Sequence, residues 1–247
     1  MLYQIILASI IGGILSLGGG IFLLWKRELA NRLSFYLISF AAGSLLGAAF
    51  FDLIPEALEG GGVAVVPFIL LGILIVFIFE SSLGWYHHHD QHLHDEHTFT
   101  VHTVLFGDAL HNFIDGIAIA IGFAVSVEVG ITTTFAVFVH EIPQEIGDFG
   151  ILIQRGYSRA KIIFYNFLTA LATLVGAVFA YFLFPFASEM FIFYALAVAA
   201  GTFIYISTSD LIPELRKYAT GNLGVRHAII IFIGIFVVAI MSDIIPG

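Results

Sequence analysis

The sequence contains no cysteine and few charged residues, and each shortage excludes a class of protein. Without cysteine the chain forms no disulfide bonds and offers no thiolate ligands. Charged residues make up 11% of the chain, whereas a soluble domain carries about 25%. The formal net charge of −9 gives no support for a nucleic-acid partner and fits surfaces that attract cations. We therefore expect neither a soluble domain nor a nucleic-acid-binding protein.

The sequence is instead rich in long apolar runs. Hydrophobic residues account for 60% of the chain, and the mean hydropathy is +1.02. Runs of about 20 apolar residues alternate with short polar breaks, which is the spacing of transmembrane helices. The N-terminus has no basic region and no small-residue cleavage site, so we interpret it as the first span rather than a removed signal peptide. We predict an all-α, polytopic membrane protein in which residues 1–247 form one transmembrane domain of eight helices, near 3–25, 34–55, 63–83, 100–124, 131–153, 162–184, 190–213 and 227–245.

The basic residues fall in only three of the breaks between these helices. They are Lys26, Arg27, Arg32, Arg155, Arg159, Lys161, Arg216, Lys217 and Arg226. Basic residues of short loops stay on the cytoplasmic side, so these breaks are expected to be cytoplasmic and both termini external. We expect an integral protein of the cell membrane, plasma or inner, and leave open whether it forms a homodimer.

A five-residue motif occurs twice. The sequence Asp-Leu-Ile-Pro-Glu occupies positions 52–56 and again positions 210–214, and each copy follows an Ala-Ala-Gly triplet at the same distance. The helices that carry the two copies run in opposite directions. We therefore predict an inverted 3+2+3 repeat, in which helices 1–3 and 6–8 surround two central helices, 4 and 5. Inverted repeats with a binding site near the midplane are common in secondary transporters.

The repeated motif has two interpretations. Proline lacks an N–H and ends or kinks a helix, so each copy could mark only a helix end. That interpretation leaves the paired Asp residues unexplained. The alternative is an acidic vestibule at each mouth of the protein, where Asp52 and Glu56 gather cations on the outer side.

Polar residues cluster in the middle of the two central spans. His111 and Asp115 are four residues apart and share a helix face. His140 and Gln144 share a face in the same way, and Asp148 extends it by one turn. At about 1.5 Å per residue, His111 lies about 16 Å into its helix, roughly half the hydrocarbon depth. Two imidazoles, a carboxylate and an amide oxygen are ligands that suit zinc and its first-row neighbours, so we predict a metal site here.

Neighbouring positions extend the same region. Asn112 and Glu141 are displaced by about 100° of helix rotation and can widen the site sideways. Pro143 cannot donate to the carbonyl of Val139, which is freed beside His140. A seam of helix–helix hydrogen bonds is the plain alternative. Ionisable groups at this depth are costly, about 2.5–3.5 kcal/mol for an Asp, and this cost favours a functional role.

These central motifs resemble one known family. The pattern His111-Asn112-x-x-Asp115-Gly116, followed by His140-Glu141-x-Pro143, is similar to the ZIP family of zinc- and iron-regulated-type transporters, most of all to the branch with an H-E-x-P-H-E-x-G-D signature. The resemblance covers essentially the whole chain. It implies uptake of Zn²⁺, Fe²⁺ or Mn²⁺ into the cytoplasm as the transported substrate, with no cofactor and no enzymatic activity.

The resemblance also implies roles for single residues. It gives His111, Asp115, His140 and Gln144 the primary metal positions, and Asn112, Asp115, Glu141 and Gln144 the positions of a neighbouring second site. The sequence departs from the family pattern at two of these places. Gln144 stands where that branch has a second His, and Thr173 stands where some relatives carry a Glu.

Further polar residues suggest a route for the ion. The cytoplasmic loop 86–97 is rich in histidine, which is typical of metal-binding tracts, and its histidines are His87, His88, His89, His92, His94 and His97. A solvated connector is the alternative for this loop. We interpret His102, Asp108, Glu145, Asp148 and Asp210 as lining the inner pathway.

Two other functions are weighed against transport. An intramembrane zinc hydrolase would use His140-Glu141 as in the H-E-x-x-H motif, but Gln144 occupies the second His position and Pro143 interrupts the motif. A non-transporting metal sensor would rely on the histidine-rich loop, and it would need no inverted repeat.

Overall fold

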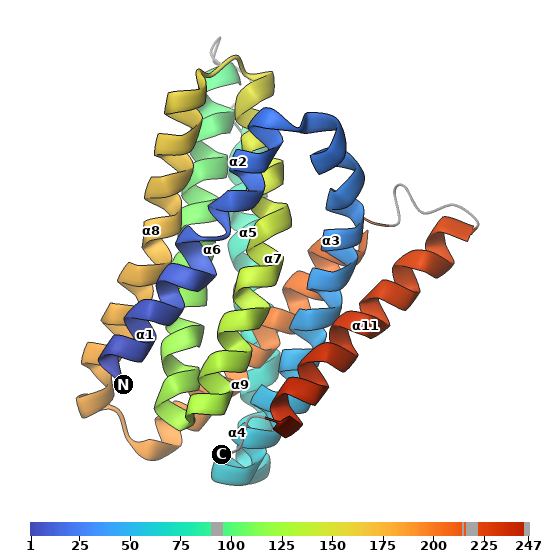
Figure 1. Cartoon of the computed structure of the whole chain (residues 1–247). Helices are drawn as coiled ribbons and strands as arrows, with labels where there is room; N and C mark the ends of the chain where they lie inside the picture. The colour runs from blue at the N-terminus through green and yellow to red at the C-terminus, as the bar shows by residue number, and fades with distance from the viewer. Residues whose placement is uncertain (90–95, 214, 216–221, 245–247) are drawn as a thin grey trace.

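The computed structural model describes residues 1–89, 96–213, 215 and 222–244, and this part of the chain is built from helices without strands (Figure 1). The α-helices are α1 (Leu2–Ser9), α2 (Leu17–Trp25), α3 (Arg27–Ala48), α4 (Ile54–Gly61), α5 (Val66–His89), α6 (Glu96–Val125), α7 (Val127–Gln154), α8 (Arg159–Leu183), α9 (Glu189–Tyr205) and α11 (Asn222–Ile244). Three π-helical turns, η1 (Ile10–Ile14), η2 (Ala49–Leu53) and η5 (Ile206–Leu211), and two 3₁₀ turns, η3 (Gly62–Val65) and η4 (Phe184–Phe186), join or extend them.

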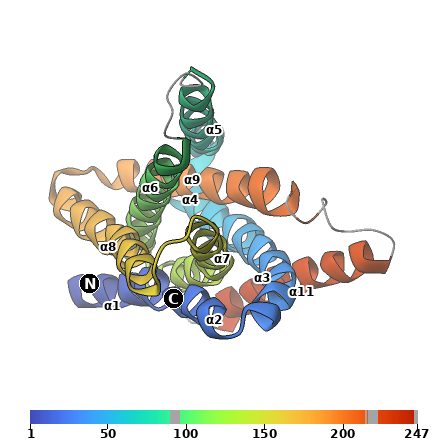
Figure 2. The same ribbon diagram turned by 90° about the horizontal axis from the view of Figure 1, so that it is seen from above.

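Six helical stretches are long and apolar enough to cross a membrane. They are Leu2–Trp25, Phe35–Phe79, Leu105–Val125, Arg159–Phe186, Glu189–Leu211 and Gly224–Ser242. The second stretch reverses direction at Gly62, whose φ of 61° is one that glycine adopts without strain. Helix α7 is outside this set, and acidic residues recur along it. It packs against α2, α3, α6 and α8 and lies in the middle of the bundle (Figure 2). The predicted all-helical membrane protein is therefore confirmed.

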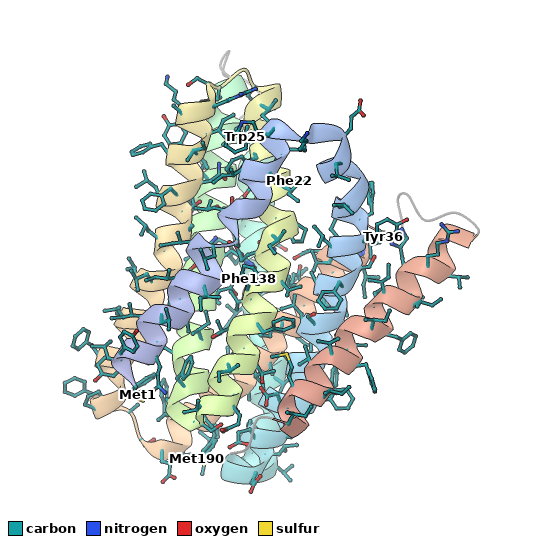
Figure 3. The ribbon with its side chains drawn as sticks, viewed as in Figure 1. Met1, Phe22, Trp25, Tyr36, Phe138 and Met190 are labelled. Carbon is teal, nitrogen blue, oxygen red and sulfur yellow. The ribbon has the colours of Figure 1, made fainter. Side chains whose placement is uncertain are left out.

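The distribution of side chains is the reverse of that in a soluble protein. Large apolar side chains project outward around the bundle, and Trp25 at the end of α2 is 64% exposed (Figure 3). The interior instead holds buried polar groups on the central helices, such as Asn112, His140 and Glu141. A continuous apolar exterior of this kind is stable in lipid and not in water.

Two pairs of helices cross at glycine contacts that correspond to each other in the repeat. Helix α3 packs on α11, where a Cβ built on Gly234 would lie 3.1 Å from the Cα of Gly43. Helix α9 packs on α5, where a Cβ built on Gly72 would lie 3.0 Å from the Cα of Gly201. Gly43 and Gly201 are the glycines of the two Ala-Ala-Gly triplets. Since any side chain at these crossings would push the backbones apart, the two triplets serve the same packing purpose.

The repeated Asp-Leu-Ile-Pro-Glu motif coincides with a π-helical turn in both copies. Turn η2 ends at Leu53 and turn η5 ends at Leu211. Pro55 has no N–H for the carbonyl of Phe51, and the Oγ–H of Ser242 on α11 donates to that carbonyl at 3.3 Å. The helix does not end at the first proline, because α4 continues to Gly61. Helix termination therefore does not explain the first motif, since a neighbouring hydroxyl takes over the missing hydrogen bond.

The helices also extend beyond several predicted boundaries. Helix α5 continues to His89 and α6 begins at Glu96, so both ends of the predicted loop 86–97 are helical. Residues 90–95 of that loop lie outside the described residues. Helix α7 begins at Val127, earlier than predicted, because the side chain of Ser126 accepts a hydrogen bond from the backbone N–H of Val129 at 3.2 Å.

Candidate metal centre

Helices α6 and α7 pack together and bring four metal-binding side chains to one place. His111 and Asp115 lie one turn apart on α6, while His140 and Glu141 are adjacent on α7. Their four ligand atoms all lie within 4.8 Å of one another. Asp115, His140 and Glu141 are buried, and the side chain of His111 is 20% exposed. We call these four residues the central cluster.

The separations within the central cluster match the size of a tetrahedral ion. The Nε2 atoms of His111 and His140 are 3.1 Å apart. Oδ2 of Asp115 lies 3.1 Å from Nε2 of His140 and 3.6 Å from Nε2 of His111. Oε1 of Glu141 lies 3.6 Å from Nε2 of His111 and 3.7 Å from Nε2 of His140. A tetrahedral zinc ion with bonds of about 2.0–2.1 Å holds its ligand atoms about 3.3–3.4 Å apart, so small movements would close these atoms around one ion.

The orientation of one imidazole is fixed by the backbone. Nδ1 of His140 lies 2.9 Å from the carbonyl oxygen of Ala136, one turn earlier on α7. A carbonyl oxygen only accepts hydrogen bonds, so Nδ1 carries the proton and donates it. When the ring is neutral, this tautomer presents an unprotonated Nε2 to the central cluster. A hydrogen bond at the other ring nitrogen is the usual way in which a metal-ligating histidine is held.

Both carboxylates of the central cluster have one oxygen without a hydrogen-bond donor. Oδ2 of Asp115 and Oε1 of Glu141 are buried and accept no hydrogen bond. These are the same atoms that lie closest to the two imidazoles. Buried acceptors are normally satisfied, and leaving one without a donor costs about 1–3 kcal/mol. A cation between the four groups would satisfy both oxygens at once.

Asn112 lies beside the central cluster and binds its neighbours through hydrogen bonds. Its amide nitrogen donates to Oδ1 of Asp108 at 3.0 Å and to Oε2 of Glu141 at 3.3 Å. Its Oδ1 accepts a hydrogen bond from the hydroxyl of Thr173 on α8 at 2.6 Å. The sequence singled out Thr173 only as a departure from a family pattern. Its contact with Asn112 depends on how closely α8 approaches α6, which the sequence alone does not specify.

A polar cavity of about 280 Å³ opens beside the central cluster. Its wall includes His111 and Gln144, together with the carboxylates of Asp108, Asp148 and Asp210. The structure therefore places three of the acidic residues proposed for the pathway around one cavity. It also places Gln144 in the wall of this cavity, while Glu141 is the α7 residue next to His140 in the central cluster.

A second cavity, of about 300 Å³, follows the same seam between α5, α6 and α9. Its wall consists almost entirely of apolar side chains such as Phe68, Ile117 and Val198. Ile114 and Thr202 line both cavities. These two side chains therefore form part of the wall that separates the polar cavity from the apolar one.

The other predicted pathway residues lie in different surroundings. Glu145 is buried next to Gln144 on α7, and neither of its carboxylate oxygens has a hydrogen-bond partner. Asp52 is 6% exposed, and its Oδ1 lies 3.3 Å from the hydroxyl of Ser242, whose one proton it shares with the carbonyl of Phe51, so Asp52 is packed rather than open to solvent. Glu56 is half-buried in the first turn of α4.

The remaining predicted metal-binding residues cannot be placed by their side chains. His92 and His94 lie outside the described residues. His87, His88 and His89 belong to the end of α5, and His97 and His102 to the beginning of α6, but their side chains are outside the described part of the structure.

The fold and the site together define a class of protein. Helices with apolar exteriors enclose a cluster of two imidazoles and two carboxylates, and a polar cavity leads away from it. This arrangement is that of a polytopic membrane protein whose helical bundle encloses a candidate cation site. Residues 87–242 match the model of the ZIP zinc transporter family, and the chain belongs to this family.

Curated relatives agree with the family assignment. The chain is 42% identical over 113 residues to the zinc transporter foi of Drosophila melanogaster, which covers 45% of this chain and 16% of that protein. It is 40% identical over 146 residues to the zinc transporter zipt-7.2 of Caenorhabditis elegans, which covers 58% and 32%. It is 40% identical over 130 residues to the metal cation symporter ZIP14 of Bos taurus, which covers 53% and 26%. The chain thus matches at most about a third of the length of these relatives.

The family assignment bears on the three functions weighed from the sequence. The family is one of transporters and not of enzymes, which confirms that the chain is not a hydrolase. Metal ions are carried by this family as substrates and are not retained as cofactors.

Proposed function

We propose that the chain carries divalent transition-metal ions across a membrane, with Zn²⁺ as the best-fitting substrate and Fe²⁺ and Mn²⁺ as further substrates. The observation that carries this proposal is the central cluster, whose buried nitrogen and oxygen atoms are spaced by 3.1–3.7 Å. Imidazole nitrogen suits zinc and iron, while carboxylate oxygen also suits manganese. The curated relatives are named for zinc or metal-cation transport.

The proposal includes the architecture of eight spans in an inverted 3+2+3 repeat. The two Asp-Leu-Ile-Pro-Glu motifs both begin in the last two residues of a π-helical turn, and the glycine crossing of α3 with α11 has a counterpart in that of α9 with α5. Helices α6 and α7 supply the central cluster and lie between these two halves. In repeats of this kind, one half moves against the other around a site near the midplane.

Charge and the position of the cavity support the proposed direction of transport, which is into the cytoplasm. The start of α1 and the end of α11 lie at one end of the bundle, and the junctions α2–α3 and α7–α8 lie at the other end (Figure 1). The second end carries basic residues, including Lys26 and Arg155, and would therefore be cytoplasmic, with both termini outside. The polar cavity reaches Asp148, which is two helical turns from Arg155. An ion leaving the central cluster through this cavity would therefore enter the cytoplasm.

The pathway is a sequence of exchangeable ligands. The ion would pass Asp52 and Glu56 from outside, bind the central cluster, and leave past Gln144 and the carboxylates of the polar cavity. On the cytoplasmic side it would meet the histidines of segment 86–97. Each step must exchange ligands, because an ion that is bound too tightly at one site is not released.

The test is uptake of radioactive zinc by sealed proteoliposomes that contain the purified full chain. We expect saturable uptake in the wild type, and loss of uptake in His111→Ala and Asp115→Ala at equal protein incorporation. Glu59→Ala, which removes an exposed carboxylate from α4, is the matched control and should retain wild-type uptake. Wild-type vesicles that take up no more zinc than protein-free vesicles would refute transport. Undiminished uptake in both cluster variants would refute the proposed site.

A further inference from the structure

Thr173 is a hydroxyl group placed deep inside the bundle without contact to the central cluster itself. It lies on α8 and is fully buried. Its hydroxyl donates to Oδ1 of Asn112 at 2.6 Å, which is a short hydrogen bond between two helices. Most of the other buried hydroxyls for which hydrogen bonds are described, such as those of Ser9 and Thr134, donate to the backbone of their own helix. The interhelical contact of Thr173 therefore calls for a separate explanation.

Close backbone packing holds this hydroxyl in place. A Cβ on Gly116 of α6 would clash with the carbonyl oxygen of Thr173, so α6 and α8 touch at this level. On the other side, a Cβ on Gly13 would lie 2.6 Å from the Oγ1 atom of Thr173. Thr173 is thus enclosed between two glycines, and its hydroxyl has little freedom to choose another partner.

The hydrogen bond from Thr173 fixes which way the amide of Asn112 points. With Oδ1 facing a hydroxyl donor, the NH₂ group faces Oδ1 of Asp108 and Oε2 of Glu141. The opposite orientation would place the amide oxygen against two carboxylates and lose both donations. Each polar atom of Asn112 therefore has a protein partner, and its amide nitrogen contacts the central cluster through Oε2 of Glu141.

The hydrogen bond from Asn112 gives the two carboxylate oxygens of Glu141 different surroundings. Oε2 accepts the hydrogen bond from Asn112, while Oε1 has no donor and lies 3.6 Å from Nε2 of His111. Glu141 is adjacent to His140 and would not share its helix face by spacing alone. The hydrogen bond from Asn112 explains how the carboxylate of Glu141 is nevertheless held toward the imidazoles of His111 and His140.

We propose that Thr173 is a positioning residue that acts through Asn112 to hold the carboxylate of Glu141 in the cation site. This rests on the proposed function of the central cluster and deepens it. It assigns Asn112 to orienting a ligand rather than to ligating an ion. Groups that orient metal ligands typically change metal affinity by about 10–100-fold when they are removed.

The experiment compares Thr173→Val, which keeps the shape and removes the hydroxyl, with Thr173→Ser, which keeps the hydroxyl. Binding of ZnCl₂ to the purified full chain in detergent is measured by titration calorimetry, and zinc uptake is measured in vesicles. We expect Thr173→Val to weaken binding about tenfold and to raise the KM of uptake more than it lowers the maximal rate. Thr173→Ser should stay within about twofold of the wild type. Thr134→Val, which removes a buried hydroxyl bonded only within α7, is the control and should leave zinc affinity unchanged.

A double-variant cycle separates positioning from packing. In an Asn112→Ala background, Thr173→Val should cause no further loss, because the two residues act in one chain of contacts. If Thr173→Val is lost from the membrane fraction, Thr173→Ala takes its place in the same comparison. Wild-type zinc affinity in the hydroxyl-free variant would overturn the proposal, as would equal losses in the Val and Ser variants. Failure of the wild type to bind or transport zinc would instead refute the proposed function.

Discussion

The imidazoles of His111 and His140 meet edge to face, with their ring planes at 88° and their Nε2 atoms 3.1 Å apart. In the neutral form of His140, Nε2 carries a lone pair, because the Nδ1 proton is donated to the carbonyl of Ala136. A lone pair at this distance needs a proton or a cation between the two rings. The close approach of two histidines from different helices is therefore the feature of the central cluster that most favours a shared ion.

Removing either imidazole should abolish tight zinc binding. His140→Ala takes away a fully buried imidazole and leaves the nearby carboxylates of Asp115 and Glu141 with His111 as their one remaining imidazole neighbour in the central cluster. We expect zinc affinity to fall by more than about 100-fold, which exceeds the effect typical of groups behind the ligands. Titration calorimetry of the purified variant measures this loss. His227→Gln is a control for histidine replacement, since His227 bonds Ser39 away from the central cluster. Zinc affinity within tenfold of the wild type in His140→Ala would contradict the assignment.

The metal preference should depend on Gln144. Gln144→His would introduce a second imidazole into the wall of the polar cavity, next to that of His111. Imidazole favours zinc over manganese more than an amide oxygen does, so the ratio of zinc to manganese uptake should rise. Competition between the two ions in proteoliposomes measures the ratio. Gln144→Asn, which keeps an amide, is the control, and an unaltered ratio in the His variant would count against a ligand role for this position.

Acidification should weaken zinc binding. Protons compete with the metal for the Nε2 lone pairs of His111 and His140, so binding releases protons and becomes weaker as the pH falls. We expect a clear loss of affinity when the pH is lowered from about 7.5 to about 5.5, the range in which imidazoles change charge. Calorimetry in buffers of different ionisation enthalpy measures the released protons. Binding without proton release at about pH 5.5 would argue against imidazole ligands.

The glycine crossings should be needed for stability. Gly43→Ala and Gly201→Ala would each press a methyl group against a backbone carbonyl, of Ile231 and Ile69 respectively. Overpacking of this kind costs about 1–3 kcal/mol, so the free energy of unfolding should fall by that amount in both variants. Thermal unfolding in detergent measures the change. A Cβ on Gly18 meets no atom within 4 Å, so Gly18→Ala is the matched control. Comparable losses of unfolding free energy in all three variants would show that close packing at the two crossings is not needed for stability.

Much of the fold could be predicted from the sequence because lipid imposes simple rules. Apolar runs predicted an all-helical membrane protein, while the π-helical turns at the two copies of the repeated motif were not predicted. Helix ends were harder to predict. Proline at position 55 suggested a helix end, yet the hydroxyl of Ser242, which lies far away in the sequence, compensates the missing hydrogen bond.

The residues of the candidate site could be predicted from the sequence more easily than the way they are arranged in space. Spacing by four residues paired His111 with Asp115, which the structure brings together, and His140 with Gln144. The same rule placed Glu141 on a different face of its helix from His140. In the structure, the side chains of both His140 and Glu141 reach the central cluster. The Thr173–Asn112 hydrogen bond could not be foreseen, because it depends on the backbone contact at Gly116.

The shared wall of Ile114 and Thr202 has a consequence for the electrochemical gradient across the membrane. On one side of these two residues the cavity offers carboxylates to a hydrated cation, and on the other side it offers almost only carbon. Water enters an apolar compartment of this size reluctantly, and a divalent ion cannot shed its oxygen ligands there without a large cost. For the proposed transport, the apolar lining along α5, α6 and α9 would therefore be a barrier to the return of an ion from the polar cavity. An ion could take this route only if these helices moved apart.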